Sequence, residues 1–293
     1  GGHRFTQIDA GSNRTCARKS NGEVWCWGGG LGTEGTYLGN GTLARSAVPL
    51  RVQSDSAFAS VTSGCALTAA GQAWCWGPGP VGDSSFANHL APVAVGGSIR
   101  FRELARATHT CGIATDGAMY CWGTNRWGQL VQGALTHDPF LALGPTAMVA
   151  TRSVSTDAFI DVATGTHRTC VVRTDFVVLC AGWNRAGGLG DGGAIEYTAS
   201  FTPVAGPLSA TSIDASHDAT CALRADGAAF CWGWNWFGGL GIGSRSDIGE
   251  STPQRVQGGP FTKISVGEDH TCGITPEARL YCWGADMFRQ IGR

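Results

Sequence analysis

The sequence of 293 residues contains only two lysines, Lys19 and Lys263, and no long apolar run. Without a stretch of roughly 18 apolar residues, no membrane-spanning helix is expected. The formal charge is −1, with 21 basic and 22 acidic residues, so the chain lacks the basic stripe that a phosphate backbone would need. Nucleic acid is therefore not expected as a partner. Nearly all the basic residues are arginine, a usage that we associate with a bacterial source.

The chain also lacks an initial Met and a signal sequence, because it opens with Gly1. We expect that a leader has been removed or that the chain is a piece of a longer protein. Glycine and tryptophan, in contrast, are abundant, with 45 and 11 copies. The glycines follow no Gly-X-Y period, which excludes collagen, and 43% hydrophobic residues are enough for a packed core. This composition favours an all-β globular protein with many turns between short aromatic-rich strands.

The twelve cysteines all occur in pairs that are ten positions apart. In the stretch TCGIATDGAMYCWGTNRWGQL, residues 110–130, such a pair encloses an Asp-Gly and is followed by a Trp-Gly. The pairs are Cys16/Cys26, Cys65/Cys75, Cys111/Cys121, Cys170/Cys180, Cys221/Cys231 and Cys272/Cys282. They mark six repeats of about fifty residues, a period typical of propellers and solenoids. The predicted repeats, in one domain, are 1–52, 53–97, 98–153, 154–206, 207–258 and 259–293.

Each repeat is predicted to contain four strands. The first strand ends in a small-residue turn, as in FTQIDAG (5–11), FRELARA (101–107), FIDVATG (159–165) and FTKISVG (261–267). The second and third strands contain the cysteines. The fourth contains proline, which suits an edge strand. Examples of the fourth are VPLRV (48–52), APVAV (91–95), TPVAG (202–206) and TPQRV (252–256).

The hairpin between the second and third strands explains the cysteine spacing. In the first repeat, the loop residues Ser20, Asn21 and Gly22 fit a type I turn followed by a glycine in the left-handed region. Counting outward from this loop places Cys16 opposite Cys26 in a non-hydrogen-bonded pair, with Cα atoms about 4.5 Å apart, a distance that a disulfide can bridge. The turn glycine recurs as Gly71, Gly117 and Gly227, but Phe176 and Ala278 replace it. We expect altered turns at those two positions.

Buried free thiols and metal ligands are the alternatives for the cysteines. Metal sites usually bring together cysteines that are two to four positions apart, and the sequence contains no such cluster. Six disulfides are therefore predicted, each closing a short ring that contributes roughly 2 to 3 kcal/mol on a loop-entropy account. Such a protein belongs outside the reducing cytosol, and we expect it to be extracellular or on the cell surface.

The third strands are apolar without alternation, which is typical of a sheet covered on both faces, such as a propeller blade between two neighbours. They read VWCWG, AWCWG, MYCWG, AFCWG and LYCWG. The tryptophan after the second cysteine is accordingly expected in the core. It is Trp27, Trp76, Trp122, Trp232 and Trp283, with Ala181 in the fourth repeat.

The motifs GEDHTCGI…LYCWG, WGTNRWGQL and WGWNWFGGLGIG resemble the regulator of chromosome condensation repeat family, whose repeats form β-propeller blades. The resemblance covers nearly the whole chain and implies a propeller. It differs from the family in showing six repeats where seven are common, and in the paired cysteines, which suggest a secreted bacterial branch. In this family one propeller acts as a nucleotide exchange factor on a small GTPase and docks on chromatin, and a similar one inhibits β-lactamases. The fold alone does not choose among these functions.

Catalytic signatures are missing from the sequence. It has no G-x-S-x-G, no P-loop and no H-E-x-x-H. Two segments, GLGTEG (30–35) and GPGPVG (77–82), match G-x-G-x-x-G, but neither opens a helix after a strand, and we interpret both as turns. An enzyme is the least favoured class, and no cofactor is predicted.

The candidate binding residues lie in the loops after the first and third strands, which emerge on the same rim of an up-and-down blade. They are Arg14, His109, Asn125, Trp127, His167, Arg168, Arg185, Trp234, Trp236, Phe237, Asp269 and His270, with Asn13, Met287 and Phe288 beside them. Histidines near acids could hold a metal, but their offsets vary between repeats, and ordinary loop hydrogen bonds are favoured. Aromatic residues in glycine-rich loops are typical anchors for protein partners, although packing at blade edges is the alternative.

From these residues we predict a non-enzymatic extracellular module that recognises a protein or another macromolecule through its rim. A carbohydrate-binding lectin and a structural subunit of a cell-surface assembly are the alternatives.

The two ends of the chain add a further prediction. The sequence contains six copies of strands one to three but only five of the fourth strand, since the chain stops at DMFRQIGR. We expect one three-stranded blade, completed by flanking sequence or by a neighbouring subunit, because an uncovered strand edge readily recruits another chain.

Overall fold

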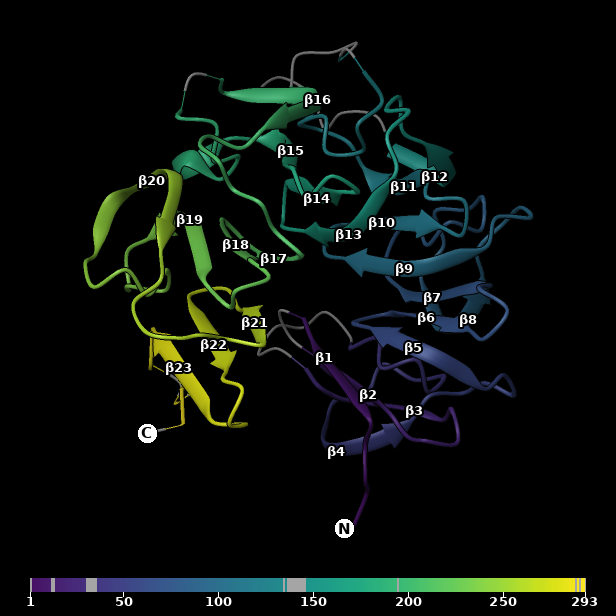
Figure 1. The fold of residues 1–293 in the computed structure, drawn as a ribbon. Coiled ribbons are helices and arrows are strands. Elements are labelled where there is room, and N and C mark those ends of the chain that lie inside the picture. Colours follow the sequence, from purple (N-terminus) through teal and green to yellow (C-terminus); the bar gives the residue numbers. More distant parts are fainter. Residues whose placement is uncertain are drawn as a thin grey trace.

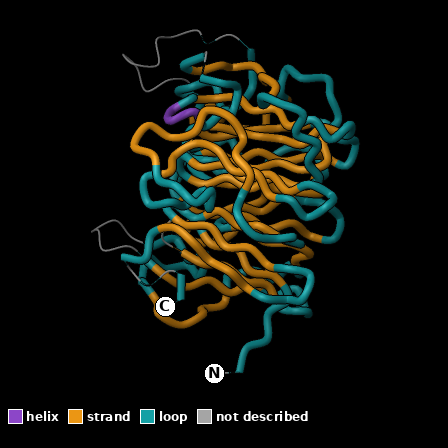
Figure 2. Tube along the Cα trace, turned by 60° about the vertical axis from the view of Figure 1, so that its left-hand side comes forward, coloured by secondary structure: helices purple, strands orange, loops and turns teal. Residues whose placement is uncertain are grey.

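Six antiparallel sheets form the blades of a β-propeller around a common centre (Figure 1). The computed structural model describes residues 2–11, 14–29, 36–133, 135, 146–193, 195–287, 289 and 291–292. Within these ranges the only helix is the short 3-10 turn η1 (Arg185–Gly187), drawn in purple in Figure 2. No helix in the described ranges is long and apolar enough to cross a membrane. The prediction of an all-β propeller is confirmed.

Strands follow one another in sequence order within each sheet. The first blade contains β1 (Gln7–Ala10), β2 (Arg14–Arg18), β3 (Val24–Gly28) and β4 (Ser46–Arg51). The second contains β5 (Phe58–Thr62), β6 (Cys65–Thr68), β7 (Ala73–Gly77) and β8 (His89–Ala94). The third contains β9 (Phe101–Arg106), β10 (His109–Ala114), β11 (Met119–Thr124) and β12 (Thr146–Arg152).

The remaining blades follow the same plan. The fourth contains β13 (Phe159–Thr164), β14 (Arg168–Arg173), β15 (Val178–Trp183) and β16 (Tyr197–Pro203). The fifth contains β17 (Ser212–Ser216), β18 (Ala219–Leu223), β19 (Ala229–Asn235) and β20 (Ser246–Arg255). Among the described residues the sixth sheet has three strands, β21 (Lys263–Val266), β22 (His270–Ile274) and β23 (Leu280–Gly284). The expected three-stranded blade is confirmed within these ranges.

The innermost strands expose an unpaired edge toward the centre, and side chains from the preceding blade cap this edge. Gln7 of β1 exchanges two hydrogen bonds with the backbone of Val61 in β5. Asp214 of β17 accepts the backbone N–H of Val266 in β21 at 2.8 Å. Burial raises the pKa of Asp214 to about 7. These polar groups at the centre join neighbouring blades, since a buried N–H without a partner is costly.

Each of the predicted disulfides joins the two cysteines of one hairpin, and the six predicted pairings are confirmed. In the first hairpin, Cys16 faces Cys26, as the register count predicts. In the third, Cys111 faces Cys121 in the same way, and the two Cα atoms are 4.1 Å apart. This separation fits a non-hydrogen-bonded pair of an antiparallel ladder. The other bonds are Cys65–Cys75, Cys170–Cys180, Cys221–Cys231 and Cys272–Cys282.

The pairing of the third strand with the fourth is interrupted directly after the second cysteine, an irregularity that the sequence interpretation did not include. In the third blade, Cys121 pairs with Thr151, but Gly123 pairs with Ala147, so β12 advances four residues while β11 advances two. The extra residues form a bulge, and Gly123 takes a left-handed φ of 103° there. The same shift follows Cys26, Cys75, Cys180 and Cys231. The ladder between β11 and β12 is therefore bulged rather than regular.

Close packing explains why glycine stands two positions after the second cysteine at each bulge. A Cβ atom on Gly123 would come 2.9 Å from the Cα atom of His109, on the facing strand β10. On Gly233 it would come still nearer to the backbone of Asp218. Only glycine combines a left-handed backbone with so close an approach. The glycine of each CWG motif is therefore required by the bulge.

The two hairpins without the turn glycine do not have altered turns, so that expectation is wrong. Phe176 and Ala278 adopt the same left-handed conformation as the glycines, with φ of 69° and 59°, against 84° at Gly22. The turn bond is also kept, because the N–H of Phe176 donates to the carbonyl of Arg173 at 2.8 Å. The rest of the hairpin fixes this conformation, and the non-glycine residue takes it up under strain.

Three of the five tryptophans that follow the second cysteine lie in the core as predicted. Trp76, Trp122 and Trp232 are fully buried, whereas Trp27 and Trp283 are half-buried. Ala181 is also fully buried in the place of the missing tryptophan. Large indoles between blades, together with the hairpin disulfides, form the core clusters that hold adjacent sheets together.

The predicted prolines lie in outer strands, but their register varies. Pro49 and Pro253 stand three residues before the buried Val52 and Val256. Pro203 instead stands directly before Val204, and β12 contains no proline. Proline is tolerated throughout because an outer strand needs only some of its N–H groups for pairing.

Candidate functional site

The loops after the first and third strands meet on one rim of the propeller. Arg185, after β15, approaches Asp218, after β17 of the next blade, with 3.6 Å between guanidinium and carboxylate. His217 also contacts Asp218, with Nδ1 3.3 Å from the carboxylate. Within this rim, the twelve predicted binding residues divide into a buried group and an exposed group.

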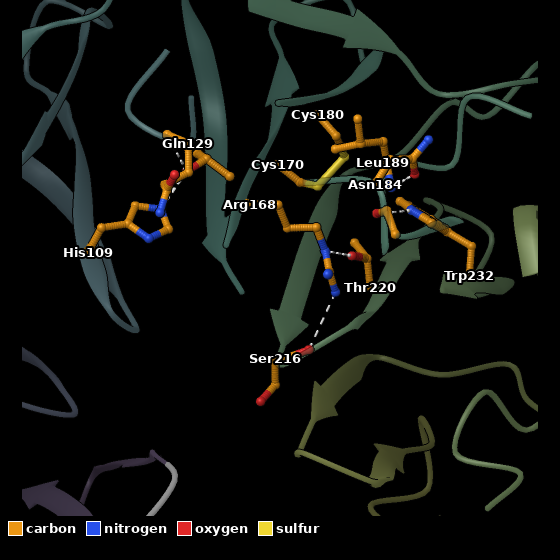
Figure 3. The surroundings of a disulfide bond; sticks show 12 residues. His109, Gln129, Arg168, Cys170, Cys180, Asn184, Leu189, Ser216, Thr220 and Trp232 are labelled. Carbon is orange, nitrogen blue, oxygen red and sulfur yellow. Dashed lines mark hydrogen bonds between the residues drawn. A yellow bond between two sulfur atoms is a disulfide. The ribbon is translucent and has the colours of Figure 1, made fainter. Parts of the chain in front are cut away.

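His109 and Arg168 belong to the buried group and tie one blade to the next. His109 Nε2 lies 2.7 Å from the hydroxyl of Thr169. Arg168 Nε donates to the hydroxyl of Thr220 at 2.9 Å and a terminal nitrogen reaches the carbonyl of Ser216 (Figure 3). Both side chains are almost inaccessible, at 2% and 1% exposure. They hold the propeller together and are not available to a partner on the surface.

Burial also sets the charge of these two side chains. It lowers the pKa of His109 to about 3, with a smaller contribution from nearby His167. The ring is therefore neutral at pH 7. Burial lowers the pKa of Arg168 to about 10, opposed by the carboxylate of Asp218. Arg14 plays the same structural role between the first two blades, where it donates to the carbonyls of Tyr37 and Ser63.

Asn125 has a repeated role in shaping the loop after the third strand. Its Oδ1 accepts the N–H of Leu130, five residues on, at 3.0 Å. The same bond joins Asn184 to Leu189 at 2.9 Å (Figure 3). It also joins Asn235 to Leu240 at 3.2 Å. Asn125 is 4% exposed, so its side chain serves the loop rather than the surface.

Trp127 is buried against Trp183, a residue that the sequence interpretation did not single out. The two rings are stacked with centroids 4.5 Å apart and an angle of 4° between planes. His167 borders both rings, at 6.4 and 5.6 Å. Trp183 stands three positions after the second cysteine, as Trp234 does in the next repeat, and this shared offset could have revealed it.

The more exposed group forms what we call the aromatic patch, consisting of the exposed Arg185 and Trp236 and the half-buried Trp234 and Phe237. Trp236 is 51% exposed. Its ring centroid lies 5.5 Å from that of Trp234 and 6.3 Å from that of Phe237. The Arg185 guanidinium lies 5.7 Å from the Trp234 ring and 5.4 Å from the Trp183 ring. The Arg185 guanidinium thus lies near one indole of each blade and extends the aromatic surface from the fifth blade to the fourth.

Asp269 and His270 adjoin the aromatic patch from the sixth blade. Together with Trp234, Trp236 and Phe237 they line a hollow of only about 10 Å³. Burial lowers the pKa of His270, and Asp269 opposes this. So small a hollow cannot enclose a small molecule, and the surface suits a flat contact.

The predicted loop segments were also compared with what a metal or phosphate site requires. No cluster of three or more His, Cys, Asp or Glu side chains in the described ranges is placed to hold a metal ion. Of residues 77–82, Gly77 ends β7 and 78–82 form an irregular loop, with left-handed conformations at Gly77, Gly79 and Gly82. The glycine-rich segment 30–35 and the rim residues Asn13 and Phe288 lie outside the described residues.

The fold and rim define a β-propeller built from repeats of about fifty residues. Two models of the regulator of chromosome condensation (RCC1) repeat match the sequence. One covers residues 226–274, and the other covers 5–35, 107–129, 210–238 and 261–289. The sequence therefore contains repeats that match this family in the first, third, fifth and sixth blades.

Known proteins of similar sequence include a receptor and a ligase. The chain is 28% identical to the ultraviolet-B receptor UVR8 of Arabidopsis thaliana over 99% of its own length and 67% of that protein. It is 27% identical to the probable E3 ubiquitin-protein ligase HERC4 of Homo sapiens over 63% of its own length. The chain spans only 17% of that ligase.

Solved structures with the same fold include yeast RCC1 (Prp20) bound to Kap60, with a TM-score of 0.77 and 18% identity. That match covers 96% of this chain and 70% of the yeast chain. Human WBSCR16 matches with a TM-score of 0.78 and 20% identity over 93% of this chain and 72% of the human one. At such identities the likeness shows the fold alone.

Proposed function

We propose that this propeller is a non-enzymatic binding module that recognises a protein through the aromatic patch. The observation that carries the proposal is the exposure of Trp236 beside Trp234, Phe237 and Arg185. Tryptophan, tyrosine and arginine are the residues most enriched in interface hot spots. Scattered exposed apolar residues are ordinary on a protein surface, but a contiguous group of this kind is less so.

The flat shape of the patch favours a protein over a small ligand. The hollow beside it, of about 10 Å³, has no room for a bound metabolite. Asp269 and His270 add polar groups at its border, so that an apolar centre has a polar rim, as protein interfaces do. The solved complex of Prp20 with Kap60 and the receptor UVR8 are precedents for a binding role of this fold.

The proposed place of action is outside the cell or on its surface. Six disulfides, one for each blade and all buried except the half-buried Cys272–Cys282, suit an oxidising compartment, because disulfides are rare in the reducing cytosol. The partner is accordingly an extracellular or surface protein.

The test compares three immobilised proteins against the extracellular and surface proteins of the source organism. These are the unaltered chain, Trp236→Ala, and Phe86→Ala, which removes an aromatic side chain of 62% exposure from the loop after β7 in another blade. We expect the unaltered chain and Phe86→Ala to retain the same partner protein in similar amounts. Trp236→Ala should retain at least about tenfold less of it. Equal retention by all three variants would contradict the role of the aromatic patch.

A glycan array probed with the same three proteins separates the lectin alternative. Binding to a defined glycan that Trp236→Ala abolishes would replace the protein partner by a carbohydrate, since indole faces stack on sugars as well as on proteins. The aromatic patch would then remain the site, and only the ligand class would change.

A further inference from the structure

Two arginine side chains on the rim converge on one glycine of the second blade. Gly77 ends β7, and a Cβ atom on it would lie 3.2 Å from Nη2 of Arg106, the last residue of β9 in the third blade. The same point lies 3.4 Å from Nη1 of Arg14, the first residue of β2 in the first blade. The second blade lies between the other two (Figure 1). Two guanidinium groups from its neighbours are therefore close together beside its third strand.

Hydrogen bonds to the protein hold both guanidinium groups in place. Nη1 of Arg106 donates to the carbonyl of Gly64 at 3.0 Å. Arg14 donates from Nη1 to the carbonyl of Tyr37 at 2.8 Å and from Nη2 to the carbonyl of Ser63 at 3.0 Å. Its Nε also donates to the hydroxyl of Ser63 at 3.2 Å. Because both side chains are fixed before a ligand arrives, a ligand that binds them has a smaller entropy cost to overcome.

Several N–H groups of the two arginines have no acceptor among the described residues. A guanidinium group has five N–H groups. Arg106 donates only from Nη1, which leaves Nη2 and Nε, and Arg14 retains one N–H on each terminal nitrogen. The Arg106 side chain is half-buried, and neither Nη2 nor Nε is fully cut off from solvent. A ligand that accepts hydrogen bonds can therefore reach these donors.

The two arginines also lack a counter-charge. In the part of the chain that the structure describes, no carboxylate forms an ion pair with either guanidinium. Burial lowers the pKa of Arg106 to about 9, and the charge of Arg14 contributes to this shift. Burial also lowers the pKa of Arg14 to about 10, against an opposing effect of Asp9. Both groups remain charged at pH 7, and their mutual repulsion favours the binding of an anion.

The fourth blade shows how the same fold neutralises arginines on this rim. Arg168 stands two positions before the first cysteine of its repeat, as Arg14 does. Its guanidinium lies 3.6 Å from the carboxylate of Asp218, and Arg185 lies 3.6 Å from the same carboxylate. Two arginines of the fourth blade thus share one acid of the fifth. Within the described ranges, no acid takes this place between Arg14 and Arg106.

The sequence distinguishes this place from the other blades at two positions. The residue before the first cysteine is threonine in every other repeat, but it is Gly64 in the second. A Cβ atom on Gly64 would come 3.0 Å from Cζ of Arg14, so the glycine makes room for the guanidinium. The four other blades whose inner strands pair as β9 does at Arg106 have an uncharged residue there. These residues are Ala10, Thr164, Ala215 and Val266. The blade fold itself therefore does not require an arginine at position 106.

We propose that Arg14 and Arg106 bind a sulfate or phosphate group on the rim beside Gly77. The planar fork of a guanidinium matches the oxygens of such a group, and hydrogen bonds to a charged acceptor are stronger than neutral ones. The bound anion neutralises both arginines, as Asp218 does for its two partners, and joins the first blade to the third. The site is separate from the aromatic patch, so the proposal does not depend on the proposed function.

Isothermal titration calorimetry with sodium sulfate and sodium phosphate, at constant ionic strength, tests the proposal. The proteins are the unaltered chain, Arg106→Gln, Arg106→Lys and the control Arg255→Gln, which removes an equal charge from an exposed position of β20. We expect the unaltered chain and Arg255→Gln to bind each anion saturably at a single site with similar affinity. Arg106→Gln should bind at least about tenfold more weakly. Arg106→Lys should recover part of this loss, because lysine restores the charge but not the planar fork.

Urea unfolding with and without sulfate shows whether each variant folds and whether the anion stabilises it. Bound sulfate should raise the unfolding midpoint of the unaltered chain and Arg255→Gln more than that of Arg106→Gln. The general effect of sulfate on protein surfaces should be equal in all of them. A folded Arg106→Gln that binds sulfate as tightly as the unaltered chain would overturn the proposal. If Arg106→Gln does not fold, an unchanged affinity of Arg106→Lys would overturn it, since we expect a loss of at least about threefold.

Glucose 6-sulfate, titrated in the same way, distinguishes two sources of the anion. Binding of this ester that Arg106→Gln weakens would show that the site accepts a sulfate group carried by a larger molecule. Binding of the inorganic ions alone would show a resident ion that joins the blades. Either result supports an oxyanion site at Arg14 and Arg106. Failure of all three compounds to bind the unaltered chain saturably would overturn the proposal.

Discussion

Gly190 lies so close to Trp232 of the next blade that a Cβ atom on the glycine would come 2.7 Å from the indole Nε1. The same relation repeats between Gly39 and Trp76, Gly82 and Trp122, and Gly241 and Trp283. Between the third and fourth blades both members change, since Val131 takes the glycine position and Ala181 the tryptophan position, in one core cluster. The size of this loop residue in one blade thus matches the size of the third-strand residue that it contacts in the next blade.

This pairing predicts a strong coupling between two substitutions. Gly190→Val should destabilise the protein by about 2 to 4 kcal/mol through overpacking and a left-handed valine, and Trp232→Ala by about 3 to 5 kcal/mol through a cavity. The double variant should lose at least about 1 kcal/mol less than the sum, because valine partly fills the space of the indole. Urea unfolding of the four proteins measures this coupling. Simple additivity would show that the two sites do not contact each other energetically.

The strained hairpin turn at Ala278 predicts a stabilising substitution. Ala278 has φ of 59° and is exposed, so Ala278→Gly removes left-handed strain without loss of buried surface. We expect a gain of about 0.5 to 1 kcal/mol in the free energy of unfolding, after the higher entropy of glycine in the unfolded chain is subtracted.

Gly227 holds the same turn position in the fifth blade, and Gly227→Ala should destabilise the protein through left-handed strain and because its Cβ atom would come 2.5 Å from the Cβ atom of Pro260. Both variants are compared by urea unfolding. No gain from Ala278→Gly would mean that the hairpin holds the left-handed turn without strain.

Much of the fold can be predicted from the sequence because the same pattern of cysteines, tryptophan and glycine recurs in most of the repeats. The cysteine spacing fixes the hairpin register, and the tryptophan after Cys75 or Cys231 marks the core. Burial on the rim was harder to foresee. His109 and Trp127 look like surface loop residues along the chain, and only the next blade, which brings Thr169 and Trp183, buries them.

The same limit applies to the turns and to the outer strands. Phe176 adopts a glycine conformation because the tertiary structure overrides its local preference. The bulge after Cys121 depends on how β12 pairs, and a count within one hairpin cannot reveal it. Pro203 shares a motif with Pro253 yet pairs two residues further along, since hydrogen bonds of the neighbouring strand fix the register. Features that depend on contacts outside the hairpin cannot be predicted from the sequence pattern of the hairpin alone.

Neutral, buried His109 predicts a loss of stability in acid. Its pKa falls from 6.5 to about 3 on folding, so the unfolded chain takes up the proton first. The stability that this residue contributes is complete above pH 6.5 and is lost as the pH falls toward 3. His109→Gln keeps a group able to bond Thr169 and cannot titrate. Between about pH 7 and 4.5 the variant should lose about 2 kcal/mol less than the unaltered protein, as measured by urea unfolding at both pH values. Identical losses would show that His109 titrates normally.

Because each disulfide closes a short ring within one hairpin, we expect the disulfides to contribute similar amounts to the free energy of unfolding. The paired substitution Cys170→Ala and Cys180→Ala opens one short ring and should cost about 2 to 3 kcal/mol on the loop-entropy account. Removal of Cys111 and Cys121 together should cost a similar amount. Intact mass should show no thiol available for alkylation before reduction, since the described chain contains no free cysteine. Non-reducing peptide maps that reveal bridges between repeats would contradict the hairpin pairing.

Trp236 and Trp232 should respond in opposite ways to the same substitution, although they are only four positions apart. Trp232 is fully buried and Trp236 is 51% exposed. Trp232→Ala should therefore destabilise the protein by about 3 to 5 kcal/mol, whereas Trp236→Ala should change stability by less than about 1 kcal/mol. Partner binding should show the reverse for Trp236→Ala, with a loss of about 2 kcal/mol or more. If Trp236→Ala unfolds the protein as readily as Trp232→Ala does, then Trp236 is a packing residue, and the aromatic patch loses its anchor.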